Sequence, residues 1–304
     1  MHLKTAVIGI GSNSVRMLVS EVDGQTGKRM FRERAGTRLF AGLDAQRCLQ
    51  PSAMEHTSDA VKAMVESARN HGVEDIQLFA TSATRDAVNN GVFSQMLLEK
   101  TGLALQICSG NEEALLSFLG AAGGGYSGVI DIGGGSTEIV CGDGNAFSCS
   151  VSCQMGAVRL YRMMPIADEQ DMYKVTELAR QILKQNLDSA QSFALPDRWT
   201  GTGGTFTTLA AMALNVPWTD RTKVHGTKLE RSWVESEAAM LARMSMEQRL
   251  QLKGLQPNRA DIIVHGICIL IACMHYFGID EIRVSEYGNL DGFTQKHYGL
   301  TEFR

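Results

Sequence analysis

Short apolar runs alternate with longer amphipathic stretches along the whole chain, and this alternation predicts an α/β fold. Residues 5–22 hold two apolar runs separated by Gly11-Ser12-Asn13-Ser14, which predicts two strands joined by a turn. The run 76–80 is predicted to be a buried strand. Within 52–69 the positions expected to face the core follow helical spacing: Met54, Thr57, Val61, Met64, Val65 and Ala68.

The same alternation continues through the rest of the chain. Strands are predicted at 103–110, 147–153 and 282–288, with a strand pair interrupted by glycines at 127–140. Helices are predicted at 111–123, 155–164, 168–191, 205–212 and 291–298, with a largely helical region at 220–259 and a buried helix at 259–278. The apolar helix contains His265 and His275, which have no partner at ligand spacing and are expected to be core histidines.

Two segments of the chain resemble each other. VIGIGSNSVR (7–16) and VIDIGGGSTE (129–138) are identical in five of ten columns. A repeat of this kind indicates an internally duplicated architecture with an anion held between two similar halves. Chance similarity between short apolar hairpins is the alternative. The copies differ at one telling position, because Gly9 stands where the second copy has Asp131.

The second copy carries the residue types of a phosphate and metal site. Gly133, Gly134 and Gly135 allow successive N–H groups to converge on one anion, and Ser136 follows them. Carboxylates at both ends of the turn, Asp131 and Glu138, suit a hydrated Mg²⁺ beside that anion. A tight hairpin that needs glycine only for its geometry remains the alternative.

Three further segments hold candidate residues. Gly203 and Gly204 precede a predicted helix opened by Thr205, which suits either a phosphate at the helix start or a tight loop. Thr81 and Ser82 are expected to cap a helix with Arg85 near its start, where the guanidinium either binds phosphate or faces solvent.

The acidic pair Glu112 and Glu113 begins another predicted helix. We assign Glu112 to a favourable interaction with the helix dipole. Glu113 lies at a strand-to-helix junction, which is where a catalytic base would lie in an open α/β sheet.

Composition narrows the class of protein without identifying it. The 304 residues suffice for two domains, and a net charge of −4 gives no global field for DNA, so a polyanion would need a local basic patch. The seven cysteines include no C-x-x-C pair and predict reduced thiols in a cytoplasmic protein. No apolar segment reaches the ~20 residues of a membrane span.

The motifs together resemble the exopolyphosphatase / guanosine pentaphosphate phosphatase (Ppx/GppA) family in its short, two-domain form. The N-terminal matches are GSNSVR (11–16), ATSATRDAVN (80–89), SGNEEA (109–114) and VIDIGGGSTEIV (129–140). The C-terminal matches are GTGGT (201–205), KVHG (223–226), GL-x-P-x-RADII (254–263) and VSEYG (284–288).

The resemblance implies the duplicated actin-like ATPase (ribonuclease H-like) fold, with two domains and an interdomain cleft. The first domain is expected at 1–122, joined by the C-terminal helix 291–304, and the second at 123–290. The implied activity is Mg²⁺-dependent release of terminal orthophosphate from polyphosphate, or of the 5′ γ-phosphate of guanosine pentaphosphate. Polyphosphate or guanosine penta/tetraphosphate would be the partner of a cytoplasmic protein without DNA or membrane, and a homodimer is expected.

The resemblance also implies roles for individual residues. Glu113 would be the general base for the attacking water, with Asp131 and Glu138 as catalytic and metal-binding carboxylates. The phosphate-binding residues would be Gly11, Ser12, Asn13, Ser14, Arg85, Gly133, Gly134, Gly135 and Ser136, and we add Gly203, Gly204 and Thr205 from their position before a helix.

The chain departs from the family pattern at two positions. Gly9 replaces the family's Asp, and Leu290 replaces the Arg of its G-L-R-x-G motif. These changes leave open a second hypothesis, a catalytically impaired sensor that binds polyphosphate or (p)ppGpp. A third hypothesis, an ATP-using kinase or ATPase, rests on fold analogy alone.

Overall fold

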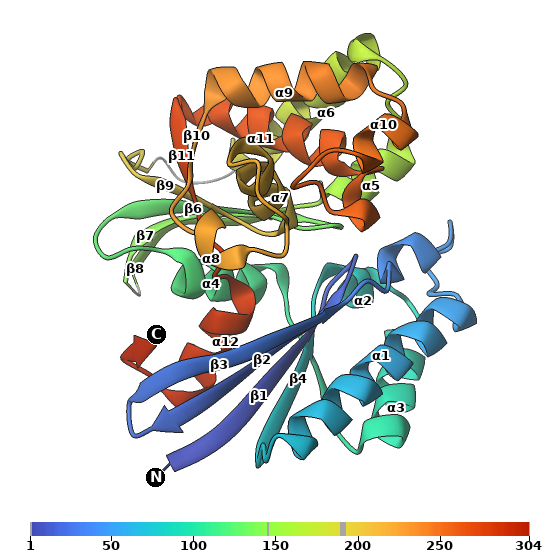
Figure 1. Cartoon of the computed structure of the whole chain (residues 1–304), viewed down its shortest axis with the longest axis vertical. Coiled ribbons are helices and arrows are strands. Elements are labelled where there is room, and N and C mark those ends of the chain that lie inside the picture. The colour runs from blue at the N-terminus through green and yellow to red at the C-terminus, as the bar shows by residue number, and fades with distance from the viewer. Residues whose placement is uncertain (1, 145, 189–192, 304) are drawn as a thin grey trace. The chain divides into compact units, whose positions relative to one another are not determined.

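The computed structural model describes residues 2–144, 146–188 and 193–303. The chain divides into two compact units, each with its own mixed six-stranded sheet (Figure 1). Unit 1 consists of Met1–Gly120 and Asn289–Arg304, and unit 2 consists of Ala121–Gly288. The last helix of the chain therefore belongs to the unit formed by the first 120 residues.

The sheet of unit 1 has the strand order β12-β3-β2-β1-β4-β5. Its strands are β1 (His2–Ile10), β2 (Val15–Asp23), β3 (Thr26–Ala35), β4 (Asp75–Ala80), β5 (Leu105–Ile107) and β12 (Glu302–Phe303). Strands β1, β2 and β3 form an antiparallel meander, whereas β4 and β5 run parallel to β1. The central strand β1 is apolar on both faces because helices cover both of them.

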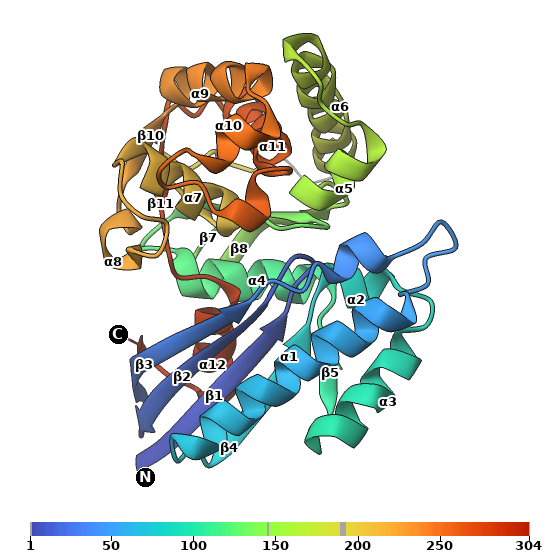
Figure 2. The same cartoon turned by 45° about the vertical axis from the view of Figure 1, so that its right-hand side comes forward.

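Five helices of unit 1 matter for the site. They are α1 (Pro51–Asn70), α2 (Ser82–Asp86), α3 (Asn90–Thr101), α4 (Gly110–Ala121) and α12 (Asn289–Tyr298). Helices α1 and α12 contact opposite faces of the sheet (Figures 1 and 2). On the α12 face, Leu290 and Phe293 join a core cluster with Val7, Leu18 and Phe79.

The sheet of unit 2 has the strand order β10-β11-β9-β6-β7-β8. Its strands are β6 (Ser127–Ile132), β7 (Thr137–Asp143), β8 (Ala146–Cys153), β9 (Trp199–Thr202), β10 (Lys228–Glu230) and β11 (Glu281–Val284). Its helices are α5 (Ala157–Met163), α6 (Glu169–Leu187), α7 (Gly204–Ala213), α8 (Arg221–Val224), α9 (Arg231–Arg243), α10 (Met246–Leu250) and α11 (Ile263–Phe277). The almost wholly buried α11 forms the centre of the core of this unit.

The two sheets repeat one connectivity. In each, the first two pairings are antiparallel (β1–β2 and β2–β3; β6–β7 and β7–β8), and two strands then join in parallel (β4 and β5; β9 and β11). Only the sixth strand differs, since β12 extends the meander of unit 1 and β10 the parallel edge of unit 2. The duplicated α/β fold predicted from the repeat is confirmed.

Most predicted elements are present, with several corrections. Strand β3 was not predicted, and the helix expected after Thr81 is broken into α2 and α3. Strand β10 interrupts the region 220–259, and α11 begins at Ile263 after a short 3₁₀ turn at Pro257–Arg259. Strands β5 and β11 are shorter than expected. Residues 189–191 of the helix predicted at 168–191 lie outside the described residues.

The predicted core residues divide into confirmed and corrected cases. All seven cysteines are free thiols, and all but Cys48 are buried. His265 is buried as expected, whereas the prediction for His275 is wrong, because its ring is half exposed and lies 2.7 Å from Glu235. Among the helices of the described chain, none has both the length and the apolar character needed to cross a bilayer.

Candidate functional site

The carbonyl groups of the β1–β2 turn in unit 1 accept hydrogen bonds from other backbone groups of the chain. Gly11 N donates to Ser14 O at 3.0 Å. Ser12 O accepts from Phe40 N, and Asn13 O accepts from Thr37 N and Arg38 N. Within the described part of the chain, the N–H groups of Ser12, Asn13 and Ser14 donate no hydrogen bond in return. The turn is therefore fixed with several backbone donors available to an anion.

Side chains of this turn add polar groups. Asn13 is 5% exposed, and among the described residues neither atom of its carboxamide has a hydrogen-bond partner. A buried amide left in this way costs free energy unless a ligand completes it. Ser12 Oγ lies 2.8 Å from Ser82 Oγ, which links the turn to the start of α2.

The β6–β7 turn of unit 2 repeats this arrangement with different neighbours. Gly133 N donates to Ser136 O at 3.0 Å, as in the first copy. The carbonyls of Gly133 and Gly134 accept from the first backbone N–H groups of α5, and Gly135 O accepts from Arg159 Nε at 2.6 Å. The N–H groups of Gly134, Gly135 and Ser136 donate to no part of the chain that the structure describes.

Asp131 and Glu138 face each other across the β6–β7 pair. Directly opposite residues project from the same face of a sheet, so the two carboxylates lie side by side. Both are buried, at 8% and 1% exposure, and Glu138 Oε1 accepts from Ser152 Oγ at 2.7 Å. A Cβ atom on Gly203 would lie 2.7 Å from Asp131 Oδ1, so the β9–α7 turn lies against this carboxylate.

These carboxylates suit a hard divalent cation. Oxygen ligands on a rigid hairpin match what Mg²⁺ prefers, and Mg²⁺ keeps several waters of its own. Over the described residues, no cluster of three or more His, Cys, Asp or Glu side chains could enclose a metal. Two carboxylates would fill only part of the coordination shell of Mg²⁺ and would leave the remaining positions to water.

Arg85 and Glu113 form an ion pair in unit 1. Arg85 Nη1 donates to Glu113 Oε2 at 2.9 Å and to Cys108 O at 3.1 Å. Glu113 is 5% exposed, so this pair lies largely out of water. The sequence placed these two residues in separate motifs, and the structure brings the last turn of α2 together with the first turn of α4. Arg85 therefore lies at the end of its short helix and not near the start, where it was expected.

The neighbouring Glu112 has a structural role, as predicted. Ser109 N donates to Glu112 Oε2 at 2.7 Å and Glu112 N donates to Ser109 Oγ at 3.2 Å, which is a capping box at the start of α4. These hydrogen bonds hold the pKa of Glu112 below its usual range. The corresponding prediction for α2 is wrong, because the Thr81 side chain makes no capping hydrogen bond.

Arg259, which the sequence analysis missed, lies against the β9–α7 turn. A Cβ on Gly204 would fall 1.8 Å from Arg259 Cζ, so this guanidinium lies directly on the first residue of α7. An arginine at a helix N-terminus reinforces its preference for anions. The RADII motif, which begins with Arg259, was the sequence signal that could have identified this residue, but we assigned it no role.

Thr205 does not offer its side chain to a ligand at this turn. It is 1% exposed, and a Cβ on Gly266 of α11 would lie 2.3 Å from its Oγ1. Any contact of Thr205 with a phosphate would have to come from its backbone N–H.

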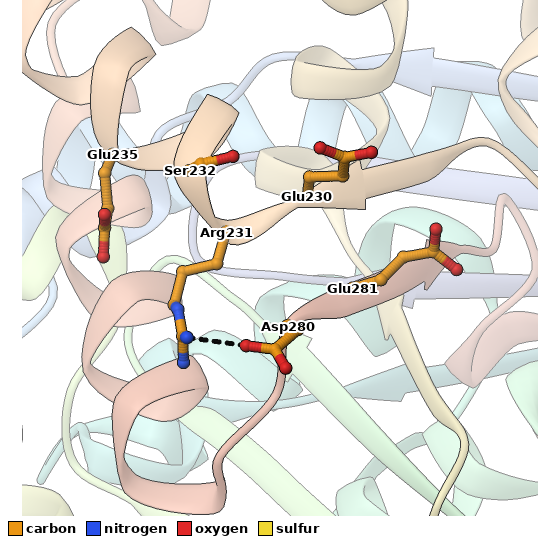
Figure 3. A pocket seen from close by; sticks show the side chains of 6 residues that line it. All are labelled: Glu230, Arg231, Ser232, Glu235, Asp280 and Glu281. Atoms are coloured by element: carbon orange, nitrogen blue, oxygen red, sulfur yellow. Dashed lines mark ion pairs between the residues drawn. The ribbon is translucent and has the colours of Figure 1, made fainter.

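A surface pocket elsewhere in unit 2 is unsuited to phosphate. Figure 3 shows its lining side chains, which are Glu230, Arg231, Ser232, Glu235, Asp280 and Glu281. The single arginine pairs with Asp280 at 2.6 Å. With four carboxylates around one cation, the pocket repels a polyanion.

Two equivalent turns with available backbone donors on a duplicated α/β fold make a candidate site for phosphate oxygens. The chain belongs to the Ppx/GppA phosphatase family, whose model matches residues 18–297.

Individual relatives agree with this assignment. The chain is 33% identical over 310 residues to Exopolyphosphatase 2 of Mycobacterium tuberculosis, covering 95% of this chain and 97% of that protein. It is 30% identical to the guanosine-5'-triphosphate,3'-diphosphate pyrophosphatase of Vibrio atlanticus, covering 92% of this chain but 56% of that protein. The solved structure of the Aquifex aeolicus PPX-GPPA enzyme matches with a TM-score of 0.81 at 27% identity, covering 97% of this chain and 100% of that one.

Proposed function

We propose that the protein is a Mg²⁺-dependent phosphohydrolase that releases terminal orthophosphate from polyphosphate or the 5′ γ-phosphate of guanosine pentaphosphate. The observation that carries this proposal is the pair of equivalent turns with occupied carbonyls and available N–H groups. The names of the relatives from Mycobacterium and Vibrio support both substrates. Both substrates end in a phosphoanhydride, so one site chemistry serves either of them.

Phosphate oxygens would be bound mainly by neutral donors. In unit 1 the N–H groups of Ser12 to Ser14 would donate to phosphate oxygens, and the amide of Asn13 would gain the partner that it lacks among the described residues. In unit 2 the N–H groups of Gly134 to Ser136 would donate in the same way. Arg259 at the start of α7 would add a fixed positive charge. Such preorganised donors stabilise the charge of the transferring phosphoryl group.

Glu113 would accept a proton from the attacking water. Its carboxylate accepts a hydrogen bond from Arg85 Nη1 at 2.9 Å, which fixes the orientation of the proposed base. A bound phosphate would compete for the same guanidinium.

Asp131 and Glu138 would hold Mg²⁺, which supplies charge neutralisation on the phosphoryl oxygens. The residues of the chain have the complementary task of fixing those oxygens and excluding bulk water.

The free thiols of the cysteines support a cytoplasmic location for the protein. We also still expect a homodimer, because symmetric dimers are the commonest oligomers.

The proposal predicts phosphate release that requires both Mg²⁺ and Glu113. Release would be measured with and without Mg²⁺ from short polyphosphate, long polyphosphate and pppGpp in parallel. Glu113→Gln should lower kcat by about 10²–10⁴, the usual contribution of a general base. The matched control is Glu112→Gln, which keeps the capping box and should stay within a few-fold of wild type. Equal rates for the two variants would contradict the role of Glu113.

A sensor that binds these polyanions without cutting them is the second candidate function. It is favoured by the surroundings of Gly9, where a Cβ would lie 2.9 Å from Phe79 Cζ and 3.2 Å from Leu290 Cδ2. A carboxylate at this position would therefore require the side chains of Phe79 and Leu290 to shift. Binding of pppGpp without phosphate release at any Mg²⁺ concentration would establish the sensor.

A further inference from the structure

The two hairpins carry different chemistry at equivalent positions. In unit 2 the pair opposite each other is Asp131 and Glu138, and in unit 1 the equivalent pair is Gly9 and Arg16. One copy therefore presents two carboxylates, and the other presents no carboxylate and a guanidinium. Since the turns themselves are alike, the difference concerns what each copy binds beside the phosphate.

The space at Gly9 is filled by apolar side chains. Phe79 from β4 and Leu290 from α12 approach the place of the missing Cβ to 2.9 and 3.2 Å. Phe79 is fixed in turn by a stacked contact with Phe293, with ring centroids 4.8 Å apart. The three side chains belong to one buried cluster, so a charged group at position 9 would lose its hydration.

The polar side chains of this region form hydrogen bonds with one another instead of pointing to position 9. Arg16 Nη2 donates to Asn289 Oδ1 at 2.9 Å, at the start of α12. Asp291, which is 2% exposed, accepts from Arg29 Nε and Arg32 Nη2 at 2.6 Å each. The two departures noted at Gly9 and Leu290 meet at one place, since a Cβ on Gly9 would lie 3.2 Å from Leu290 Cδ2.

We propose that the hairpin of unit 1 binds phosphate oxygens without a metal ligand of its own, and that Leu290 and Phe79 enforce this by occupying the place of a carboxylate at position 9. Divalent cations are then held by the carboxylates of unit 2 alone. This inference rests on the proposed function for its ligands, but its two claims concern stability and metal binding and are measured without catalysis.

The first experiment tests whether the space at position 9 is closed. Gly9→Asp should lower Tm by on the order of 10 °C, because it buries an unpaired carboxylate against Phe79 and Leu290. Gly91→Asp is the matched control, since a side chain there meets open space near the start of α3. In Gly9→Asp/Leu290→Ala the loss of Tm should be smaller than the sum of the two single losses, because the smaller side chain leaves room. A Gly9→Asp protein with the Tm of the control would overturn the proposal.

The second experiment locates the metal with Mn²⁺ as a probe, titrated by electron paramagnetic resonance in the absence of substrate. Asp131→Asn should weaken Mn²⁺ binding by roughly tenfold or more, since even residues behind a metal ligand contribute that much. Leu290→Ala should leave the affinity unchanged. Unaltered affinity in Asp131→Asn would overturn the assignment of the cation to unit 2. If the expected Tm and Mn²⁺ results are obtained but no substrate releases phosphate, the proposed hydrolysis fails and this inference stands.

Discussion

At the scale of the residue, the two turns need glycine for the same steric reason. A Cβ on Gly11 would lie 3.2 Å from Ser14 O, and one on Gly133 would lie 3.0 Å from Ser136 O. Gly11 N donates to Ser14 O and Gly133 N donates to Ser136 O, so in each turn the close approach comes from the hydrogen bond that closes the turn. The position is glycine in both copies because the turn closes on itself, independently of any ligand.

Asn13 offers a test at this scale, because binding and stability should respond in opposite senses. Asn13→Ala removes a buried amide with no partner in the described chain, so the free energy of unfolding should stay within about 1 kcal/mol of wild type or rise. Polyphosphate binding should weaken by about 10- to 100-fold, the value of one hydrogen bond to a charged group. Chemical denaturation and calorimetric binding measure the two effects.

The control for this prediction is Asn89, whose amide is fully used. Asn89 Oδ1 accepts from Leu49 N at 2.8 Å and Asn89 Nδ2 donates to Leu49 O at 3.0 Å. Asn89→Ala should therefore cost about 1–3 kcal/mol of stability and leave polyphosphate affinity unchanged. If Asn13→Ala destabilised the protein as strongly as Asn89→Ala, the amide of Asn13 would have an internal structural role.

Single residues also show how far sequence reasoning extends. The sequence assigned Glu112 to the helix dipole because of its place in the first turn, and the structure adds a capping box with Ser109 that was not predicted. The position of Arg259 on Gly204 was not, since it depends on packing between segments 55 residues apart. The burial of Thr205 against Gly266 was hidden for the same reason.

At the scale of the element, α11 places an ionisable group inside the core. His265 is 2% exposed, its Nε2 lies 3.0 Å from Met164 O, and its ring packs edge-on against Tyr161. Burial lowers the pKa of His265 from 6.5 to about 4, against the opposing effect of the hydrogen bond to Met164 O. The charge of Arg249 also lowers this pKa, and that of Asp261 raises it. The ring is therefore neutral in the folded protein at pH 7.

The depressed pKa of His265 predicts a loss of stability in mild acid. The unfolded chain takes up this proton near pH 6.5 and the folded chain only near pH 4, so stability is full above 6.5 and falls as the pH drops towards 4. At pH 5 the loss should be about 2 kcal/mol. His265→Gln, which retains a donor for Met164 O, should show a correspondingly smaller drop between pH 7.5 and 5 in urea unfolding. An equal drop in both proteins would show that other groups cause it.

Elements were predictable where one physical signal dominated. The amphipathic α1 is confirmed with every predicted core position buried. Strand β3 escaped notice because half of its sequence, TGKRMFRERA, is charged and its conformation comes from pairing with β2 and β12. The break between α2 and α3 and the start of α11 at Ile263 depend on local turns that the apolar pattern does not register.

At the scale of the whole molecule, the two units differ in the number of chain segments that form them. Unit 2 is one continuous segment with its own large core, whereas unit 1 is assembled from both ends of the chain. Helix α12 supplies Leu290 and Phe293 to the cluster that contains Val7 and Phe79. The short strand β12 then pairs with β3 at the edge of the same sheet.

This difference predicts unequal behaviour of fragments. Fragment 121–288 should unfold cooperatively alone, because every described residue of its core cluster lies within it. Fragment 1–120 should bind a hydrophobic dye and lack a cooperative transition, since the apolar face for α12 is uncovered. Adding a peptide of residues 289–304 should restore the transition. Calorimetry checks these outcomes, and a cooperative fragment 1–120 that ignores the peptide would contradict them.

The late position of α12 also sets a timetable for synthesis. A ribosome makes the whole of unit 2 before it makes the helix that completes unit 1. Unit 2 can then fold while unit 1 still exposes Val7, Phe79 and Leu116. The apolar face of unit 1 therefore stays uncovered on the nascent chain until α12 is made, and the sheet that carries the β1–β2 turn completes its core only then.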